Sequence, residues 1–482
     1  MKLSRIFVLL SALLVSLTLE AGELRLHHLL SDHAVLQRNS VIPVVGWGKP
    51  GATVQVSASW HKKPITVKVE KDGSWAVGIP TWEAQRVPQS LEVSSGKERI
   101  ILSDLLIGEV WICSGQSNME MPLGGWDHQR VQNAYETIRD AASATPLVRM
   151  FTVQRNNADT LQEDCGGSWQ CSAPAAVRHF SATAYHFGKT LSQFMPDVPI
   201  GLVATDWGGT PIEAWLSVEA LENTPGIDVA FSKTLHWGEV TTGQLFNGMI
   251  YPLRNYPARG FIWYQGEANL DNPKDYPSIT VSMVNEWRAL WRNPDMPYYL
   301  VQIAPYSYDE PDGFKLPVLV ENQYRIPTLL EHCGIASTTD IGHKDCIHPP
   351  FKKEVGERLA WLALANDYGF GNIPVTPTYK SVSFDGAVAR VSFNGVSTVG
   401  NCWRVHGLHE KLELLGFEVA GEDHVWHTAQ ASVDWNSNDI LVHSDEVPAP
   451  VAVRYAWHNW PAGANVVTDY GLPLPPFRSV DW

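Results

Sequence analysis

Cysteine and clustered positive charge are both scarce in this sequence. Only six cysteines occur in 482 residues, which is far too few for a fold held together by disulfides. Cys165 and Cys171 are near enough in sequence to bridge locally, and their spacing leaves open whether they do. Acidic residues outnumber basic ones, 51 to 36, and Lys or Arg never occurs more than twice in succession. A nucleic-acid partner is therefore not expected.

Long apolar runs are also missing, except at the amino terminus. A short basic start is followed by an apolar stretch over residues 6–19 and a polar sequence after Ala21. This pattern is typical of a secretory signal peptide, which we place at residues 1–21. The stretch is too short to cross a bilayer, so we expect a protein without a membrane span that is secreted or periplasmic.

Two common cofactor and metal motifs are absent or misplaced. The sequence contains no HExxH motif. Residues 46–51 match GxGxxG, but Pro50 and Gly51 lead into the alternating residues 53–56, which predict a strand. A dinucleotide-binding loop must open a helix, so these glycines are interpreted as turn residues.

The hydropathy pattern divides the remaining chain into three parts. Residues 22–105 alternate apolar and polar side chains between short turns, which predicts an N-terminal β-sandwich domain. Residues 106–375 alternate apolar strands with helical segments, which predicts an α/β domain with a mostly parallel sheet. Residues 376–482 return to short strands, which predicts a C-terminal β-rich region.

Three predicted strands of the α/β part end in polar, glycine-containing turns. Ser117 follows the strand at 109–112, Gly209 follows the strand at 200–204, and Gln265 follows the strand at 260–264. The carboxyl ends of parallel strands meet at one edge of a sheet, where ligands bind. A serine on such a turn is suited to act as a nucleophile, and paired glycines allow backbone N–H groups to approach an oxyanion.

Two tandem Asp-x-x-His pairs compete for the role of general base. They are Asp340 with His343 and Asp345 with His348. Either spacing lets a carboxylate hold the imidazole that accepts the serine proton. We favour the second pair, because His348 directly precedes the two prolines that open a predicted helix over 351–364. The same segment, with Cys346, also offers ligands for a metal-dependent hydrolase.

These segments together resemble the sialate O-acetylesterase-like branch of the SGNH-hydrolase superfamily. The resemblance covers nearly all of the chain after the signal peptide and includes Gly115-Gln116-Ser117-Asn118-Met119 and Trp263-Tyr264-Gln265-Gly266-Glu267. The other matching segments are residues 31–38, 46–51, 108–114, 207–210, 246–250, 268–269, 345–349, 453–457 and 471–473.

The resemblance implies an SGNH-hydrolase three-layer αβα domain that removes acetyl groups from sugar hydroxyls without a cofactor or metal. It implies Ser117 as the nucleophile, His348 as the general base and Asp345 as the residue that orients the imidazole. The oxyanion is expected to bind the N–H groups of Ser117 and Gly209 and the side chain of Gln265. Glu267 and Asn269 are expected to support the site.

The substrate stays open at this stage. A sialate 9-O-acetylesterase activity is favoured by the resemblance, and acetyl esterases of plant polysaccharides such as xylan or pectin are the alternative. A sialic acid would need a local arginine, for which Arg130, Arg155, Arg254 and Arg259 are available. A carbohydrate-binding protein with a decayed site is a further alternative, and the presence of all three triad residues argues against it.

Tryptophan is the abundant residue, with 20 in the chain. Trp111 and Trp263 lie on predicted central strands and are expected in the core. Trp126, Trp207 and Trp215 lie near the predicted catalytic turns, where an indole face can stack on a sugar ring. These three are the candidates for substrate binding.

Overall fold

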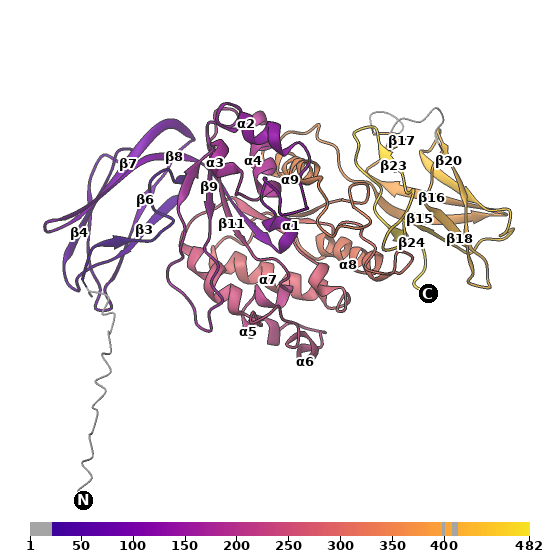
Figure 1. Ribbon diagram of the computed structural model, residues 1–482, viewed down its shortest axis with the longest axis horizontal. Coiled ribbons are helices and arrows are strands. Elements are labelled where there is room, and N and C mark those ends of the chain that lie inside the picture. Colours follow the sequence, from indigo (N-terminus) through magenta and orange to yellow (C-terminus); the bar gives the residue numbers. More distant parts are fainter. Residues whose placement is uncertain (1–21, 398–400, 407–412) are drawn as a thin grey trace, which may run out of the picture.

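A mostly parallel β-sheet lies at the centre of the computed structural model, which describes residues 22–397, 401–406 and 413–482 (Figure 1). The predicted signal peptide, residues 1–21, lies outside the described residues. The strands follow one another across the sheet in the order β10-β9-β11-β8-β12-β13-β14. All neighbouring pairs are parallel except β10 with β9. The strand bounds are β8 Glu98–Gly115, β9 Val148–Thr152, β10 Trp169–Cys171, β11 Ile200–Asp206, β12 Gly260–Tyr264, β13 Tyr298–Val301 and β14 Cys333–Ala336.

Helices cover both faces of this sheet. Helices α4 (Ala182–Phe194) and α9 (Lys352–Asp367) pack on one face, and α7 (Tyr276–Leu290) and α8 (Lys315–Leu329) pack on the other (Figure 1). Each face therefore has its own apolar core. Along β8, Val110 and Ile112 belong to one core while Trp111 and Cys113 belong to the other. This double burial explains the nearly continuous apolar run of the strand.

Shorter helices lie at the ends of the strands and between the larger helices. They are α1 Ser117–Glu120, α2 Ala134–Ala144, α3 Pro174–Val177, α5 Val218–Glu222, α6 Val229–Ser232, η1 Ile212–Ala214, η2 Phe246–Ile250, η3 Tyr251–Asn255 and η4 Glu267–Asn269. Helix α1 and helices η1 and η4 follow β8, β11 and β12 at the carboxyl edge of the sheet. In the described part of the chain, no helix is both long and apolar enough to cross a membrane.

The N-terminal strands are joined to the central sheet by one long strand. The first half of β8 pairs with β7 and its second half pairs with β11 and β12, so residues 105 and 106 lie inside a continuous strand. The predicted boundary between the first two parts thus falls within β8. The other N-terminal strands are β1 Arg25–Leu26, β2 Val35–Gln37, β3 Val41–Trp47, β4 Thr53–Ala58, β5 Ile65–Lys68, β6 Ser74–Pro80 and β7 Gln85–Ser95.

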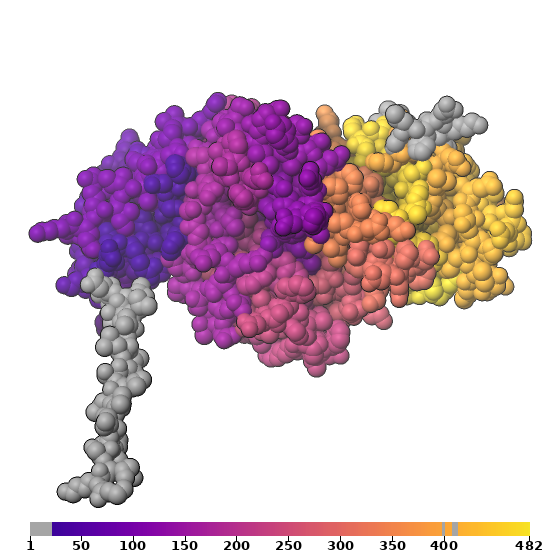
Figure 2. Space-filling model, viewed as in Figure 1, coloured from indigo at the N-terminus to yellow at the C-terminus, as the bar shows by residue number. Residues whose placement is uncertain are grey.

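The C-terminal region consists of antiparallel strands with a separate apolar core. Four of them form a sheet in the order β15-β16-β21-β20, and four others form a sheet in the order β19-β18-β22-β24. This region and the N-terminal strands lie at opposite ends of the molecule (Figures 1 and 2). The bounds are β15 Thr378–Asp385, β16 Val388–Asn394, β17 Trp403–Val405, β18 Phe417–Ala420, β19 Trp426–Thr428, β20 Gln430–Asp434, β21 Asp439–His443, β22 Ala452–Tyr455, β23 Val466–Thr468 and β24 Phe477–Arg478.

The close packing of α9 on α4 makes a testable prediction. A Cβ atom at Gly356 would lie 2.6 Å from the Cβ atom of His186 and 2.7 Å from the backbone nitrogen of Phe187. We therefore expect Gly356→Ala to destabilise the protein by about 1–3 kcal/mol, because the two helices must separate. Thermal unfolding followed by calorimetry measures the change. Gly371→Ala is the control, since a Cβ atom there meets nothing within 4 Å, and equal effects of the two variants would contradict the prediction.

Candidate active site

Ser117 begins α1, two residues after β8 ends. The intervening turn is pressed against β12: the backbone nitrogen of Gln116 donates to the carbonyl of Tyr264 at 2.9 Å. Gly115 has a φ of 141°, and a Cβ atom there would lie 2.2 Å from the Tyr264 carbonyl oxygen. Only glycine fits this position, and the serine is consequently held at the carboxyl edge of the sheet with its side chain partly exposed.

His348 meets Ser117 across 231 residues of sequence. Its Nε2 atom lies 2.9 Å from Ser117 Oγ, and its Nδ1 atom lies 2.8 Å from Gln129 Oε1. An amide oxygen only accepts hydrogen bonds, so this arrangement places the imidazole proton on Nδ1. The Nε2 lone pair then faces the serine hydroxyl, as a general base requires.

The structure differs from the sequence-based prediction at the third position of the triad. Gln129, rather than Asp345, lies against Nδ1 of His348. Asp345 is exposed, and its backbone nitrogen donates to His343 Nδ1 at 3.2 Å. The turn between His343 and Cys346 directs His348 inward and leaves Asp345 at the surface. The Asp-x-x-His spacing alone could not show this turn.

A buried polar network connects the turn that carries Ser117 to the loop that carries His348, which we call the histidine loop (residues 343–350). The Asn118 side-chain nitrogen donates to Glu267 Oε1 at 2.6 Å and to the carbonyl of Ile347 at 3.0 Å. The Asn118 oxygen accepts from Lys352 Nζ at 2.6 Å. Residues 118 and 347 are the sequence neighbours of Ser117 and His348, so one amide fixes the separation of the reacting groups. Glu267 therefore supports the site through Asn118.

Burial and positive charge keep His348 neutral. Burial and the nearby ammonium of Lys352 together lower the pKa of His348 to about 4, and burial is the larger cause. Burial also lowers the pKa of Lys352 to about 7, against the opposing effect of Glu267, and raises the pKa of Glu267. The imidazole is thus unprotonated, and available as a base, at neutral and mildly acidic pH.

The glycine turn after β11 lies directly beside the nucleophile. A Cβ atom at Gly208 would be 3.1 Å from the Cβ atom of Ser117. The backbone nitrogen of Gly208 donates to Glu120 Oε2 at 2.6 Å, which ties this turn to α1. The backbone nitrogens of Ser117 and Gly209 donate to no other group in the described part of the chain. Two N–H groups therefore remain free near the reacting serine.

The side chains of Gln265 and Asn269 form hydrogen bonds to other buried groups and are not available to an oxyanion. Gln265 is fully buried, and its amide nitrogen donates to Asn269 Oδ1 at 2.7 Å and to the Thr210 carbonyl at 3.2 Å. Both of its N–H groups are used, so the predicted role of Gln265 as an oxyanion donor is not supported. Asn269 continues the network by donating to Glu213 and accepting from the backbone of Ile212. Together they hold the end of β12 against the turn that contains Gly209.

The tryptophans expected in the core and those named as candidates for substrate binding differ in their surroundings. Trp111 and Trp263 are fully buried, as predicted. Trp215 is also fully buried and donates to Thr210 Oγ1, so it is a core residue and cannot contact a sugar. Trp126 is half-buried and packs edge-on against the imidazole of His348 at 4.9 Å. Trp207 is half-buried beneath the guanidinium of Arg155.

The residues between Asp340 and His348 that could bind a catalytic metal do not bring their ligand atoms together at one point. Both carboxylate oxygens of Asp340 are paired with Arg358 at 2.7 Å, and His348 is engaged with Ser117 and Gln129. In the described ranges, groups with donor atoms within 4.8 Å of one another lie elsewhere: His27 with Asp164 and Cys165, and His33 with Asp104 and Cys171. Cys165 and Cys171 are free thiols in these separate groups and do not form a disulfide.

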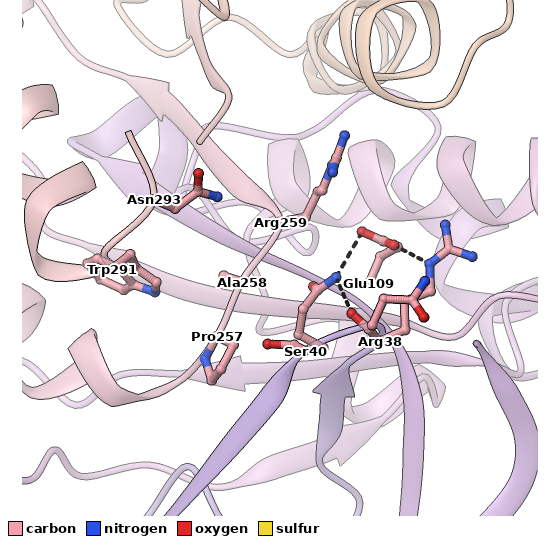
Figure 3. Close-up of a pocket in the computed structure, with 10 residues that line it drawn as sticks. Arg38, Ser40, Glu109, Pro257, Ala258, Arg259, Trp291 and Asn293 are labelled. Carbon is pink, nitrogen blue, oxygen red and sulfur yellow. Dashed lines mark hydrogen bonds and ion pairs between the residues drawn. The ribbon is translucent and has the colours of Figure 1, made fainter. Parts of the chain in front are cut away.

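A polar cavity of about 340 Å³ lies at the amino ends of the parallel strands, whereas Ser117 lies at their carboxyl ends (Figure 3). It is lined by Arg38, Ser40 and residues 257–259, and the Glu109 carboxylate at its wall is paired with Arg38 (Figure 3). Glu109 and Arg259 lie at the amino ends of the parallel segments that lead to the catalytic turns. This cavity is therefore separate from the Ser117–His348 site.

Several site residues were missed by the sequence-based prediction. Gln129 lies in an irregular loop without a periodic signal, and Lys352 is the first residue of a helix predicted only for its apolar face. Asn118 was part of the nucleophile motif without an assigned role. Trp237 lies against Gly209, where a Cβ atom would be 2.3 Å from its indole ring. Only folding brings these residues to the site.

Comparison with known proteins identifies the family of this chain. The family model for carbohydrate esterase, sialic acid-specific acetylesterase, matches residues 107–364. Sialate O-acetylesterase from Homo sapiens is 28% identical over 93% of this chain and 91% of its own length, and the Mus musculus protein is 26% identical over 93% of each. The crystal structure of a carbohydrate acetylesterase from Xanthomonas citri has a TM-score of 0.84 and 34% identity, covering 95% of this chain and all of that one.

The family match covers more than half of the chain, and it includes Ser117, Gly209 and His348. The Xanthomonas structure extends the similarity to the flanking β regions. The chain therefore belongs to the carbohydrate esterase family of sialic acid-specific acetylesterases, and the protein is a carboxylic ester hydrolase.

Proposed function

We propose that this protein is a secreted serine esterase that removes O-acetyl groups from sugars through an acetyl-serine intermediate. The observation that carries the proposal is the 2.9 Å contact between Ser117 Oγ and His348 Nε2, with Nδ1 of the same ring held by Gln129. Nucleophile and base are thus already within hydrogen-bonding distance and correctly oriented.

The reaction then proceeds in two stages. His348 Nε2 takes the proton of Ser117 as Oγ attacks the acetyl carbonyl, and the imidazolium returns that proton to the leaving sugar oxygen. Water enters, loses a proton to the same nitrogen and attacks the acetyl-serine. The bond between the acetyl carbon and Ser117 Oγ then breaks, and the imidazolium returns its proton to Oγ as acetate leaves. The carbonyl of Gln129 holds the imidazole throughout.

The oxyanion of each tetrahedral intermediate is assigned to the N–H groups of Ser117 and Gly209. Support comes from the closeness of the glycine turn to Ser117 and from the absence of other acceptors for these two N–H groups in the described part of the chain. Donors fixed by the backbone need no reorganisation as charge develops on the carbonyl oxygen.

For the architecture, we propose the SGNH-hydrolase three-layer αβα arrangement over residues 106–375. The parallel strand order and the helices on both faces of the sheet support it. Residues 22–105 and 376–482 are then the flanking N-terminal and C-terminal β-sandwich regions. Secretion or export to the periplasm follows from the sequence at residues 1–21.

For the substrate, we propose an O-acetylated sialic acid of the 9-O type, with acetylated xylan or pectin as the alternative. The names of the curated relatives favour the first, and the Xanthomonas relative is named only as a carbohydrate acetylesterase. Arg155, Arg254 and Arg259 are paired with Glu120, Glu163 and Asp367 respectively. Arg130 is exposed beside Gln129 and has no ion pair in the described ranges, so it can receive a sugar carboxylate. Acetate release from acetylated sialoglycans, xylan and pectin decides between the substrates.

Replacing the nucleophile tests the proposed function directly. We expect Ser117→Ala to reduce acetate release by at least about a thousand-fold, because no covalent intermediate can form. The variant should keep the circular dichroism spectrum and melting temperature of the wild type. His343→Ala is the matched control and should stay active, since His343 does not contact Ser117. Activity retained in Ser117→Ala, or lost with a chelator, would overturn the mechanism.

The pH profile tests the neutral state of His348. The base must be unprotonated, and its pKa lies near 4, so kcat/KM should hold steady from neutral pH to about 5 and be half-lost near pH 4. Lys352→Met removes a charge that lowers this pKa and should move the acid limb to higher pH. Circular dichroism at each pH confirms that the protein stays folded. A wild-type limb near pH 6.5 would contradict this account.

The residue that orients His348 can be identified by paired variants. Loss of an orienting group allows the wrong imidazole tautomer, which reduces kcat by up to about 10⁴-fold in a serine protease. We expect Gln129→Ala to lose at least about a hundred-fold in kcat on this basis, whereas exposed Asp345→Asn should lose little. The opposite ranking would restore the Ser-His-Asp triad predicted from the sequence.

A further inference from the structure

Two tryptophans near the reacting groups begin turns of the same construction. Trp126 exchanges two backbone hydrogen bonds with Gln129, at 2.9 and 3.0 Å. Trp237 exchanges the corresponding pair with Val240, at 3.0 and 2.9 Å. Each indole is therefore carried by a tight four-residue turn whose two ends are locked together. A side chain on such a turn loses little further backbone freedom when it binds a ligand.

Both indoles contact groups that the reaction uses. The centroids of the Trp126 ring and the His348 imidazole lie 4.9 Å apart, and the two rings meet at an interplanar angle of 76°. The ring of Trp237 covers the Cα of Gly209, where an added Cβ atom would lie 2.3 Å from Cε2 and 2.4 Å from Cδ2. The neighbouring Gly208 is in turn packed against Ser117. One indole thus lies beside the base and the other beside the proposed oxyanion turn.

Trp237 remains 55% exposed despite this contact. The exposed surface of Trp237 lies beside the glycine turn that packs against Ser117, so a molecule bound at Ser117 can reach the indole. In the described part of the chain, neither Trp126 nor Trp237 uses its indole N–H in a hydrogen bond, so both can donate to a ligand. Trp82 is equally exposed, at 57%, but lies in the N-terminal region. Trp82 is therefore a control for an exposed indole that lies outside the candidate active site.

We propose that Trp237, together with Trp126, forms the subsite that binds the ring of the acetylated sugar. The C–H face of a pyranose stacks on the Trp237 indole, and the acetyl group then reaches Ser117 beside the glycine turn. This inference rests on the proposed function and adds to it the side chains that recognise the sugar. Trp207 and Trp215, which the sequence also offered, are covered by Arg155 and by the core respectively.

The test compares a sugar substrate with a small ester that lacks a ring to stack. Trp237→Ala is assayed on O-acetylated sialic acid, on acetylated xylo-oligosaccharides and on ethyl acetate, with acetate release as the readout. We expect kcat/KM for the better sugar substrate to fall by at least about tenfold more than for ethyl acetate, mainly through KM, because only the sugar loses its stacking surface. Trp237→Phe keeps an aromatic face and should recover most of the loss.

Trp82→Ala is the matched control and should leave all three rates unchanged. An equal loss of activity of Trp237→Ala on sugar and on ethyl acetate would mean that the indole only supports the glycine turn, and this would overturn the inference. Unchanged sugar kinetics would overturn it as well.

Calorimetric titration of Ser117→Ala with the same sugars, with and without Trp237→Ala, separates the two proposals. Sugar binding that needs Trp237, without turnover by the wild type, would overturn the proposed function alone. Turnover that is independent of Trp237 would overturn this inference alone.

Discussion

The side-chain amide of Asn118 is the interaction on which the site depends. It joins Glu267 at the end of β12, Ile347 in the histidine loop and Lys352 at the start of α9, all at hydrogen-bonding distance. These elements come from three regions of the chain, and the amide lies next to Ser117. Because every partner is buried or partly buried, breaking one of these hydrogen bonds would cost about 1–3 kcal/mol, so the network favours this one arrangement. That arrangement sets the distance between Ser117 and His348.

The same network sets the electrostatics of the base. Lys352 and Glu267 lie on either side of the Asn118 amide, where burial lowers the pKa of Lys352 to about 7 and raises the pKa of Glu267. The ammonium is close enough to His348 to lower the imidazole pKa. A neutral carbonyl from Gln129 on Nδ1 stabilises the imidazolium less than a carboxylate would. The network around Asn118 therefore affects both the position of His348 and its low pKa. The site keeps this imidazole unprotonated and makes it a weak base.

Much of this organisation could be predicted from the sequence, and the exceptions have physical causes. Nearly continuous apolar runs identified the central strands, because both faces of the sheet are buried, and a period of 3.6 residues identified the helices. Ser117, Gly209 and His348 were predictable because each is tied to the end of a strand or the start of a helix. Gln129 and Trp237 were not, because they lie on irregular turns whose position depends on tertiary contacts. Asp345 was assigned by its spacing from His348, and Gln265 by its place after a strand and by the family resemblance. The local turn directs Asp345 elsewhere, and the core network directs Gln265 elsewhere.

The residues proposed for the chemistry and those proposed for sugar recognition are held by different parts of the fold. The ends of the parallel strands hold Ser117 and the glycine turn. The indoles of Trp126 and Trp237 and the side chain of Gln129 belong to two short turns that lie outside these strands. A turn closed by its own backbone hydrogen bonds can change its side chains without disturbing the sheet. Esterases that share this sheet edge can therefore differ in the sugar they accept while keeping one mechanism, and Trp237 lies where that choice would be made.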